Sequence, residues 1–409
     1  MDGIRFIHTA DLHLDSPFQG LSHLPKELFS RIQESTFKAF ETIVDEAIHH
    51  HVDFMIIVGD LYDGEDRSIK AQARLRKQML RLKNAGISAF ITHGNHDHLS
   101  GNWLALELPD NVHIFKEEVE MIPFITKDGK KVYLYGFSYP ERHVAEKKIN
   151  DYKKIDGADF HIGLLHGHWE NGGSDHQPYA PFSIQELLKK EMDYWALGHI
   201  HKRQTLHSEP YIVYPGNIQG RHRKERGEKG CYTVNLYSSG EAQLDFIPVA
   251  PIKWEQLKIE SKEEMTFSQF YHEYESRLEQ LFRNEKHGVL LEIHIEEIQK
   301  LPLEIVKKID NGEFLEMLQD GITFGESFIW PYKIHRAGES QQSHIADRTF
   351  INMLEMSIDD LALNDQFEKV LSSLYSHTYG SRYLTHISEQ EKQALIKEAK
   401  QLILKQLTV

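Results

Sequence analysis

Five short apolar runs along this chain each end at a residue whose side chain can bind a metal ion. The run at 54–58 has five apolar residues and stops at Gly59, which lets the backbone turn sharply before Asp60. Such a run predicts a buried strand of a parallel sheet. The other runs lie at 4–10, 89–93, 160–165 and 194–197. Because ligands bind at the carboxyl ends of strands in open α/β sheets, all five ends are expected to meet at one rim.

The side chains that follow these runs are carboxylates, imidazoles and an amide, with no thiolate among them. They occur in the segments Asp11-Leu12-His13, Gly59-Asp60, Gly94-Asn95-His96-Asp97, His166 and Gly198-His199-Ile200-His201. This set suits Mn, Fe or Zn better than a cysteine-type zinc site. Seven ligands are too many for one ion but enough for two ions that share a bridging carboxylate. A single Asp after a strand is also a common turn residue, so the prediction depends on the recurrence.

The ligand residues form five motifs in a fixed order. They are D-x-H at Asp11, G-D-x-x-D at Gly59, G-N-H-D at Gly94, a lone His at His166, and G-H-x-H at Gly198. Over residues 4–248 they resemble the signature of the calcineurin-like metallophosphoesterases. The order, the spacing and the additional C-terminal region resemble the SbcD-type DNA-repair exonucleases, and segments 11–18 and 214–221 are most similar to the YhaO branch of that family. The resemblance implies an α/β fold: a four-layer αββα sandwich, then a small α+β capping domain and C-terminal helices.

The resemblance also implies a role for each site residue. One ion is expected on Asp11, His13 and His201, the other on Asn95, His166 and His199, with Asp60 as the bridge. His96 matches the catalytic histidine that donates a hydrogen bond or proton to the departing oxygen. Asp63 matches the carboxylate that orients that imidazole.

Two histidines compete for one of these positions. His166 and His168 both follow the strand that ends at 164–165. His166 is the predicted ligand because it stands where the apolar run stops, and His168 is the alternative.

The length of 409 residues exceeds what one hydrophobic core usually organises. Periodicity predicts helices at 25–50 and 68–84, and Asp128-Gly129 predicts a hairpin. We expect a metallophosphoesterase domain at 1–250 and a capping domain at 251–337. The capping domain should contain strands at 254–260 and 288–296, helices at 266–282 and 303–318, and an apolar segment at 328–330. A linker at 338–344 and helices at 345–356, 364–375 and 388–407 should follow.

The net charge of −15 argues against strong autonomous binding to a polyanion. Cations at the metal site would offset part of it. Basic residues cluster at 221–226 and 74–83, and a charged run is often only a solvated face. The first cluster follows the G-H-x-H ligands closely, so Arg221 and Arg223 are the predicted substrate contacts.

A single cysteine, Cys231, and no signal-peptide or membrane-spanning pattern favour a cytoplasmic protein.

The sequence and the resemblance together predict a two-metal phosphodiesterase, with Mn²⁺ as the expected ion. The resemblance implies a DNA exonuclease or endonuclease in DNA repair, a homodimer, and an SbcC/YhaN-like coiled-coil ATPase that docks on residues 345–409. The alternative is a stand-alone phosphodiesterase or phosphatase of small substrates, because fold and metal site do not specify the substrate. A non-catalytic scaffold would be expected to have lost ligands, and all seven are present.

Overall fold

The computed structural model describes residues 3–337 except 19, 22, 65–66, 101–103, 171–178, 264 and 284, together with isolated positions between 356 and 399. One compact unit comprises Met1–Ile259, Phe267–Ile293 and Lys307–Ile334, and a second comprises Glu260–Thr266, His294–Val306 and His335–Val409. Both large sheets and the metal-ligand motifs belong to the first unit. The predicted linker at 338–344 lies outside the described residues, as do the C-terminal helices apart from those isolated positions.

The first six-stranded sheet has the order β12-β11-β1-β2-β3-β4. Its strands are β1 Gly3–Ala10, β2 Phe54–Val58, β3 Ser88–Thr92, β4 Val112–Ile114, β11 Gly230–Tyr237 and β12 Ala242–Pro248. Strands β1 to β4 are parallel, whereas β11 runs antiparallel to β1. Ala10 pairs with Val58, and Val58 pairs with Thr92. The residues that follow these three strands therefore leave the sheet at one level.

The second six-stranded sheet has the order β5-β6-β7-β8-β10-β9. Its strands are β5 Glu120–Ile125, β6 Lys131–Gly136, β7 Phe160–His166, β8 Tyr194–Gly198, β9 Gln204–Ser208 and β10 Tyr211–Tyr214. The predicted turn at Asp128-Gly129 joins the antiparallel strands β5 and β6, with Gly129 at a φ of 84°. His166 pairs with Gly198 across the parallel strands β7 and β8, so the ligands after these strands also emerge at one level.

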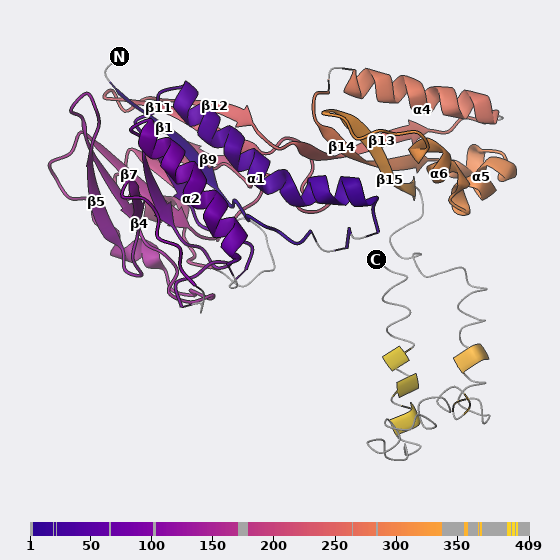
Figure 1. Ribbon diagram of the computed structural model, residues 1–409, viewed down its shortest axis with the longest axis horizontal. Coiled ribbons are helices and arrows are strands. Elements are labelled where there is room, and N and C mark those ends of the chain that lie inside the picture. The colour runs from indigo at the N-terminus through magenta and orange to yellow at the C-terminus, as the bar shows by residue number, and fades with distance from the viewer. Residues whose placement is uncertain are drawn as a thin grey trace. The chain divides into compact units, whose positions relative to one another are not determined.

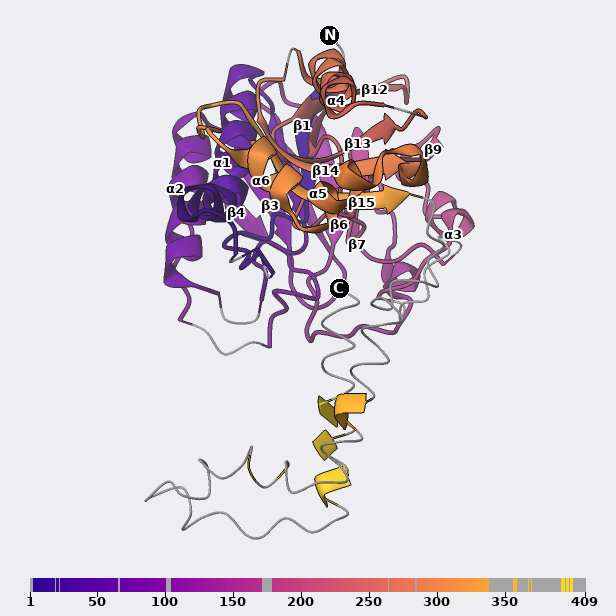
Figure 2. The ribbon, with the colours of Figure 1, turned by 90° about the vertical axis from the view of Figure 1, so that its right-hand side faces the viewer.

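Three apolar layers hold the two sheets and their helices together. The middle layer lies between the sheets, where Phe6 stacks on Phe54 at 5.0 Å and meets Tyr194 of the other sheet edge to face at 5.3 Å. The outer face of the first sheet packs on α1 (Lys26–His49) and α2 (Ile69–Asn84), which lie side by side in Figure 1. The outer face of the second sheet packs on α3 (Ile184–Leu188) and the short helix η1 (Lys148–Asp151). Figure 2 shows α1 and α2 on the opposite side from α3. The fold is the predicted four-layer αββα sandwich.

Segment 252–337 contains a three-stranded sheet in the order β13-β14-β15 with helices. Its elements are β13 Ile252–Glu260, α4 Phe267–Phe282, β14 Gly288–Glu296, η2 Ile298–Lys300, α5 Leu303–Asp310, α6 Glu313–Gln319 and β15 Phe328–Ala337. The prediction of a single helix at 303–318 is wrong. Gly312 adopts a φ of 86°, which a continuing helix cannot accommodate, and the chain forms two helices there. No helix among the described residues is long and apolar enough to cross a membrane.

Candidate metal centre

The strand ends bring the seven predicted ligands to one rim of the sandwich. Asp11 and His13 follow β1, Asp60 follows β2, and Asn95 follows β3. From the second sheet, His166 ends β7, and His199 and His201 follow β8. Asp11, His13, Asp60 and His199 all have positive φ, between 43° and 98°. Non-glycine residues rarely adopt this conformation, and such strain is concentrated at functional sites.

Two glycines leave the space that the His166 ring occupies. Gly59 has a φ of 76°, and a Cβ added to it would collide with the His166 ring. A Cβ on Gly94 would collide with Asp60 Oδ1 and come within 2.7 Å of His166 Nε2. The glycines of the G-D and G-N motifs therefore let the backbone approach the ligand side chains closely.

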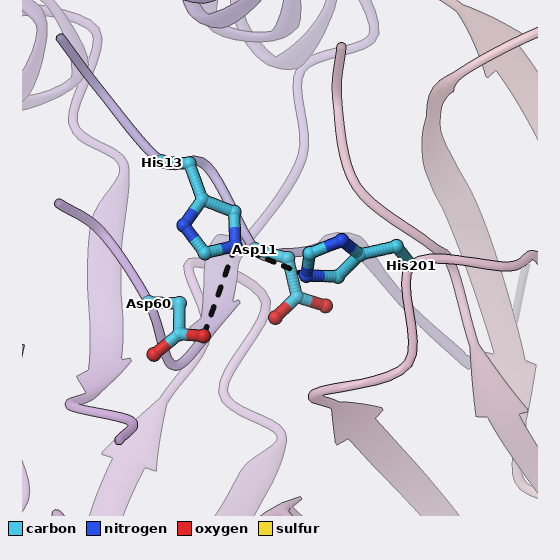
Figure 3. Close-up of side chains that lie close together, drawn as sticks. All are labelled: Asp11, His13, Asp60 and His201. Atoms are coloured by element: carbon cyan, nitrogen blue, oxygen red, sulfur yellow. Dashed lines mark hydrogen bonds and ion pairs between the residues drawn. The ribbon is translucent and has the colours of Figure 1, made fainter. Parts of the chain in front are cut away.

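The first group of donors contains Asp11, His13, Asp60 and His201, all within 4.8 Å of one another. Figure 3 shows the His13 and His201 rings directed toward each other beside the two carboxylates. The two Nε2 atoms lie 3.1 Å apart. Donors that bind one ion at about 2.1 Å from adjacent positions are separated by about 3 Å. The spacing therefore fits a shared divalent cation.

The second group contains Asn95, His166 and His199. Asn95 Oδ1 lies 3.1 Å from His166 Nε2 and 3.2 Å from His199 Nδ1. His166 Nδ1 must donate to the carbonyl oxygen of Val58 at 3.1 Å, because a carbonyl can only accept. In the form that binds a metal ion, His166 would present the lone pair of Nε2 beside the lone pairs of Asn95 Oδ1. Two acceptors that face each other in a buried site fit a cation between them.

Asp60 lies between the two groups. Its Oδ2 atom is 3.7 Å from His13 Nε2 and 3.5 Å from His166 Nε2. Its other oxygen, Oδ1, accepts from the main-chain N–H of His96 at 2.9 Å. The carboxylate is thus fixed through one oxygen and presents the other to both groups of donors, which is the arrangement that a bridging ligand requires.

The electrostatics of the pocket favour cations. Burial, and then the charge of Arg221, hold the pKa of His13 well below its usual value. Burial and the nearby His166 do the same for His199. Both rings are therefore neutral, as metal ligation requires. Burial opposes protonation of His201 too, but its hydrogen bond to Glu225 and the charge of Asp11 outweigh it and raise the pKa. The negative charge that attracts a proton there also attracts a metal ion.

The contact between His96 and Asp63 differs from the predicted one, in which the Asp63 carboxylate orients the His96 ring. His96 Nδ1 donates to the main-chain carbonyl of Asp63 at 3.2 Å, not to the carboxylate. The Asp63 carboxylate instead lies 3.0 Å from His13 Nδ1 and pairs with Arg221. The His13 ring N–H is not aligned for a hydrogen bond to that oxygen, so this contact is electrostatic. The expected carboxylate–imidazole pair is thus replaced by a main-chain contact, because the Asp63 side chain is directed toward the first donor group.

A cleft of about 900 Å³ opens onto the donors. Asp60, Asn95, His96, His199 and His201 line it. The described residues that complete the wall are Arg142, His168, Tyr179, Ile200, Lys202, Lys224, Glu225, Arg226 and Lys229.

Neither of the two predicted substrate contacts belongs to the described part of that wall. Arg221 is directed into the protein against Asp63, and Arg223 is exposed.

His168 lies on the wall with its ring centre 6.2 Å from that of His199, whereas His166 faces Asn95 and Asp60. The prediction from sequence did not include Arg142, Lys202 or Lys229. Only Lys224, Glu225 and Arg226 lie in a basic run that the sequence made visible.

The fold and the donor set define the class of protein. A model of the family described as calcineurin-like phosphoesterase matches residues 4–203. The chain is 40% identical to the metallophosphoesterase YhaO of Bacillus subtilis over 404 residues, which cover 98% of this chain and 97% of YhaO. It belongs to the calcineurin-like metallophosphoesterases and is a metal-dependent phosphoesterase.

More distant relatives match a smaller share of the chain. The DNA double-strand break repair protein Mre11 of Thermoplasma acidophilum is 25% identical over 69% of this chain and 77% of its own length. The Mre11 protein of Sulfurisphaera tokodaii is 26% identical over 56% of this chain and 59% of its own. A solved dimetal phosphatase from Danio rerio aligns over 61% of this chain and 99% of that chain, with a TM-score of 0.38 and 11% identity, a likeness too weak to support the assignment.

Proposed function

We propose that this phosphoesterase is a Mn²⁺-dependent DNA exonuclease or endonuclease that acts in DNA repair together with a coiled-coil ATPase. Two bound divalent ions would supply Lewis acidity and lower the pKa of a water molecule beside the substrate. The chain holds these ions with the two donor groups and orients the phosphodiester in the cleft.

The observation that carries the proposal is the basic wall of the cleft. Five cationic side chains line it: Arg142, Lys202, Lys224, Arg226 and Lys229, of which Arg226 also pairs with Glu292 and Lys229 also donates to the main-chain carbonyl of His201. They gather beside the metal donors of a chain whose net charge is −15. A polynucleotide presents phosphates on both sides of the scissile bond, and neutralising them dominates nucleic-acid affinity. A small diester would occupy only the metal centre. The names of the two Mre11 relatives point to the same substrate class.

His96 is the proposed general acid. Its Nδ1 atom is engaged by the Asp63 carbonyl, which leaves Nε2 to exchange a proton with a leaving oxygen in the cleft. We expect His96→Ala to retain both ions and to lose roughly 10²-fold or more in DNA cleavage. A nitrophenyl diester, whose leaving group needs no proton, should lose much less. Equal losses on both substrates would remove His96 from this role.

The test of the substrate class compares linear duplex DNA with bis(nitrophenyl) phosphate in the presence of Mn²⁺. In the variant Lys202→Glu/Lys224→Glu, the ratio of DNA to nitrophenyl turnover should fall at least tenfold. The matched control is Lys77→Glu, which changes an exposed lysine of α2. Arg74 and Lys83 of the same helix are less suitable as controls, because they pair with Glu34 and Asp110.

Two results would contradict the proposal. An unchanged turnover ratio in the double variant would remove the basic wall from substrate binding. A wild-type protein that hydrolyses the nitrophenyl diester but leaves DNA intact would be a phosphodiesterase of small substrates.

A further inference from the structure

The loop between β10 and β11 contains a buried carboxylate that contacts a metal-donor histidine. Glu225 is 8% exposed, and its Oε1 atom accepts from His201 Nδ1 at 2.7 Å. Its Oε2 atom accepts from Asn217 Nδ2 at 2.8 Å and from the main-chain N–H of Arg221 at 2.7 Å. The carboxylate therefore fixes the tautomer of His201, so that Nε2 is the nitrogen available to an ion.

A second carboxylate lies beside Nδ1 of His13, in an electrostatic contact without a hydrogen bond. Asp63 Oδ1 is 3.0 Å from His13 Nδ1, on the side of the ring away from the Nε2 atom that faces His201. Ser16 donates to Asp63 Oδ2 at 3.1 Å. Both histidines of the first donor group thus have a carboxylate behind them. The second group differs, because a main-chain carbonyl supports His166.

Arg221 connects the two carboxylates. Its main-chain N–H binds Glu225, and its guanidinium pairs with Asp63, which lies 158 positions earlier in the chain. Its side chain is 17% exposed, and its Nε atom is buried without a hydrogen-bond partner. The residue is therefore directed inward, toward the back of the metal centre.

We propose that Arg221 is a positioning residue for one of the two metal ions: it holds the Asp63 and Glu225 carboxylates so that His13 and His201 present Nε2 to the same cation. The role is specific to the first donor group. It rests on the two-metal site and not on the identity of the substrate. It also removes Arg221 from direct contact with DNA.

The test is a titration of the full chain with Mn²⁺. Calorimetry measures the binding of each ion, and electron paramagnetic resonance detects the coupled ion pair. Arg221→Gln keeps the main-chain hydrogen bond to Glu225 and loses the ion pair with Asp63. It should weaken one of the two ions tenfold or more, the usual effect of losing an outer partner of a ligand, and leave the other within about twofold. The coupled signal should become that of a single ion. Lys77→Gln removes an exposed charge and is the control.

A double-variant cycle distinguishes positioning from a general loss of charge. Asp63→Asn should weaken the same ion. The combination of Arg221→Gln with Asp63→Asn should bind that ion no more weakly than the weaker-binding single variant, because the two residues act through one contact.

Additive losses of affinity would overturn the proposal, as would equal weakening of both ions or two ions bound as in the wild type. A wild-type chain that binds no Mn²⁺ would overturn the two-metal site and this proposal together, whereas a chain that binds Mn²⁺ but does not cut DNA would affect only the substrate assignment.

Discussion

At the scale of single residues, the metal centre depends on strained backbone conformations and on glycines, which have no side chain. Asp11, His13 and Asp60 have positive φ within three residues of the ends of their strands. Gly59 and Gly94 provide the room for His166. Each strained residue costs of order 1–3 kcal/mol, so the surrounding sheets must over-determine these conformations. The buried strands on both sides supply that constraint.

Asp60 provides the most direct test of the two-metal arrangement. We expect Asp60→Asn to bind at most one Mn²⁺ ion tightly and to lose diesterase activity, because the neutral amide cannot bridge two cations. Metal analysis and turnover of the nitrophenyl diester measure both effects. Asp110→Asn, at an exposed aspartate that pairs with Lys83, is the control. Two tightly bound ions with near-normal turnover would show that Asp60 does not bridge.

His8 predicts a pH dependence of stability. Burial lowers its pKa from the usual 6.5 to about 3, and it packs against Tyr194 Oη at 2.9 Å. The folded state keeps His8 neutral while the unfolded chain takes up a proton below pH 6.5. Stability is therefore full above that pH and falls as the pH drops from 6.5 toward 3, by about 2 kcal/mol at pH 5.

His8→Gln should remove this contribution. Denaturant unfolding at pH 7 and pH 5, with a chelator present so that metal release contributes nothing, measures the difference. The loss on acidification should be about 2 kcal/mol smaller in the variant than in the wild type. An identical loss in both proteins would show that His8 is not the group that titrates.

At the scale of elements, the helices and turns around the sheets set where the loops of the site begin. Helix α2 starts at Ile69, and the Ser68 side chain accepts from the Ala71 N–H at 3.0 Å. The same hydroxyl donates to Asp15 Oδ2 at 2.6 Å, in the loop that follows the D-x-H motif. One side chain thus caps the helix and holds the loop of the first donor group.

Removing this cap should loosen the start of α2. Ser68→Ala should lower the protection of the amides at 69–75 about fivefold, since a lost cap costs about 1 kcal/mol. Hydrogen exchange followed by mass spectrometry measures the effect by segment. Ser68→Thr retains an acceptor and should keep the protection. If the alanine variant exchanges as the wild type does, the hydroxyl does not stabilise the helix.

At the scale of the whole molecule, the acidic net charge and the basic cleft act over different distances. The chain has 62 acidic and 47 basic residues, yet the described wall of the cleft includes five Lys or Arg side chains. At physiological salt, screening limits charge interactions to about 8 Å, so a phosphate inside the cleft responds mainly to the local cations. Weak attraction at long range and favourable contacts at short range are compatible with the proposal that a partner delivers this enzyme to DNA.

The proposed ATPase partner leads to a prediction about the C-terminal region. Leu395 is 45% exposed, and we expect Leu395→Glu in the full chain to abolish capture by an SbcC/YhaN-like coiled-coil ATPase while Mn²⁺ stoichiometry stays unchanged. Leu281→Glu, at an exposed leucine of α4, is the matched control. A chain that ends at residue 337 should behave like the first variant. Undiminished capture by either protein would place the docking surface elsewhere.

The sequence by itself predicted the five apolar strands β1, β2, β3, β7 and β8 and the candidate donors at their ends. It could do so because each donor directly follows an apolar run, and parallel strands end at a common edge. The outer helices were also predictable from their apolar periodicity, with α1 at Lys26–His49 close to the expected 25–50.

Only the tertiary structure decided the environment of those donors. Asp63 contacts His13 and Arg221 through its side chain, and the partner Arg221 comes from a loop 158 positions away. No local pattern encodes such a pair, because it depends on how two loops fold over the ends of different strands. The cleft cations Arg142 and Lys202 likewise come together only when the strands of the second sheet are assembled, because Arg142 follows β6 and Lys202 follows β8. Periodicity identifies what an element buries, whereas the contacts between loops follow from the packing of the whole sandwich.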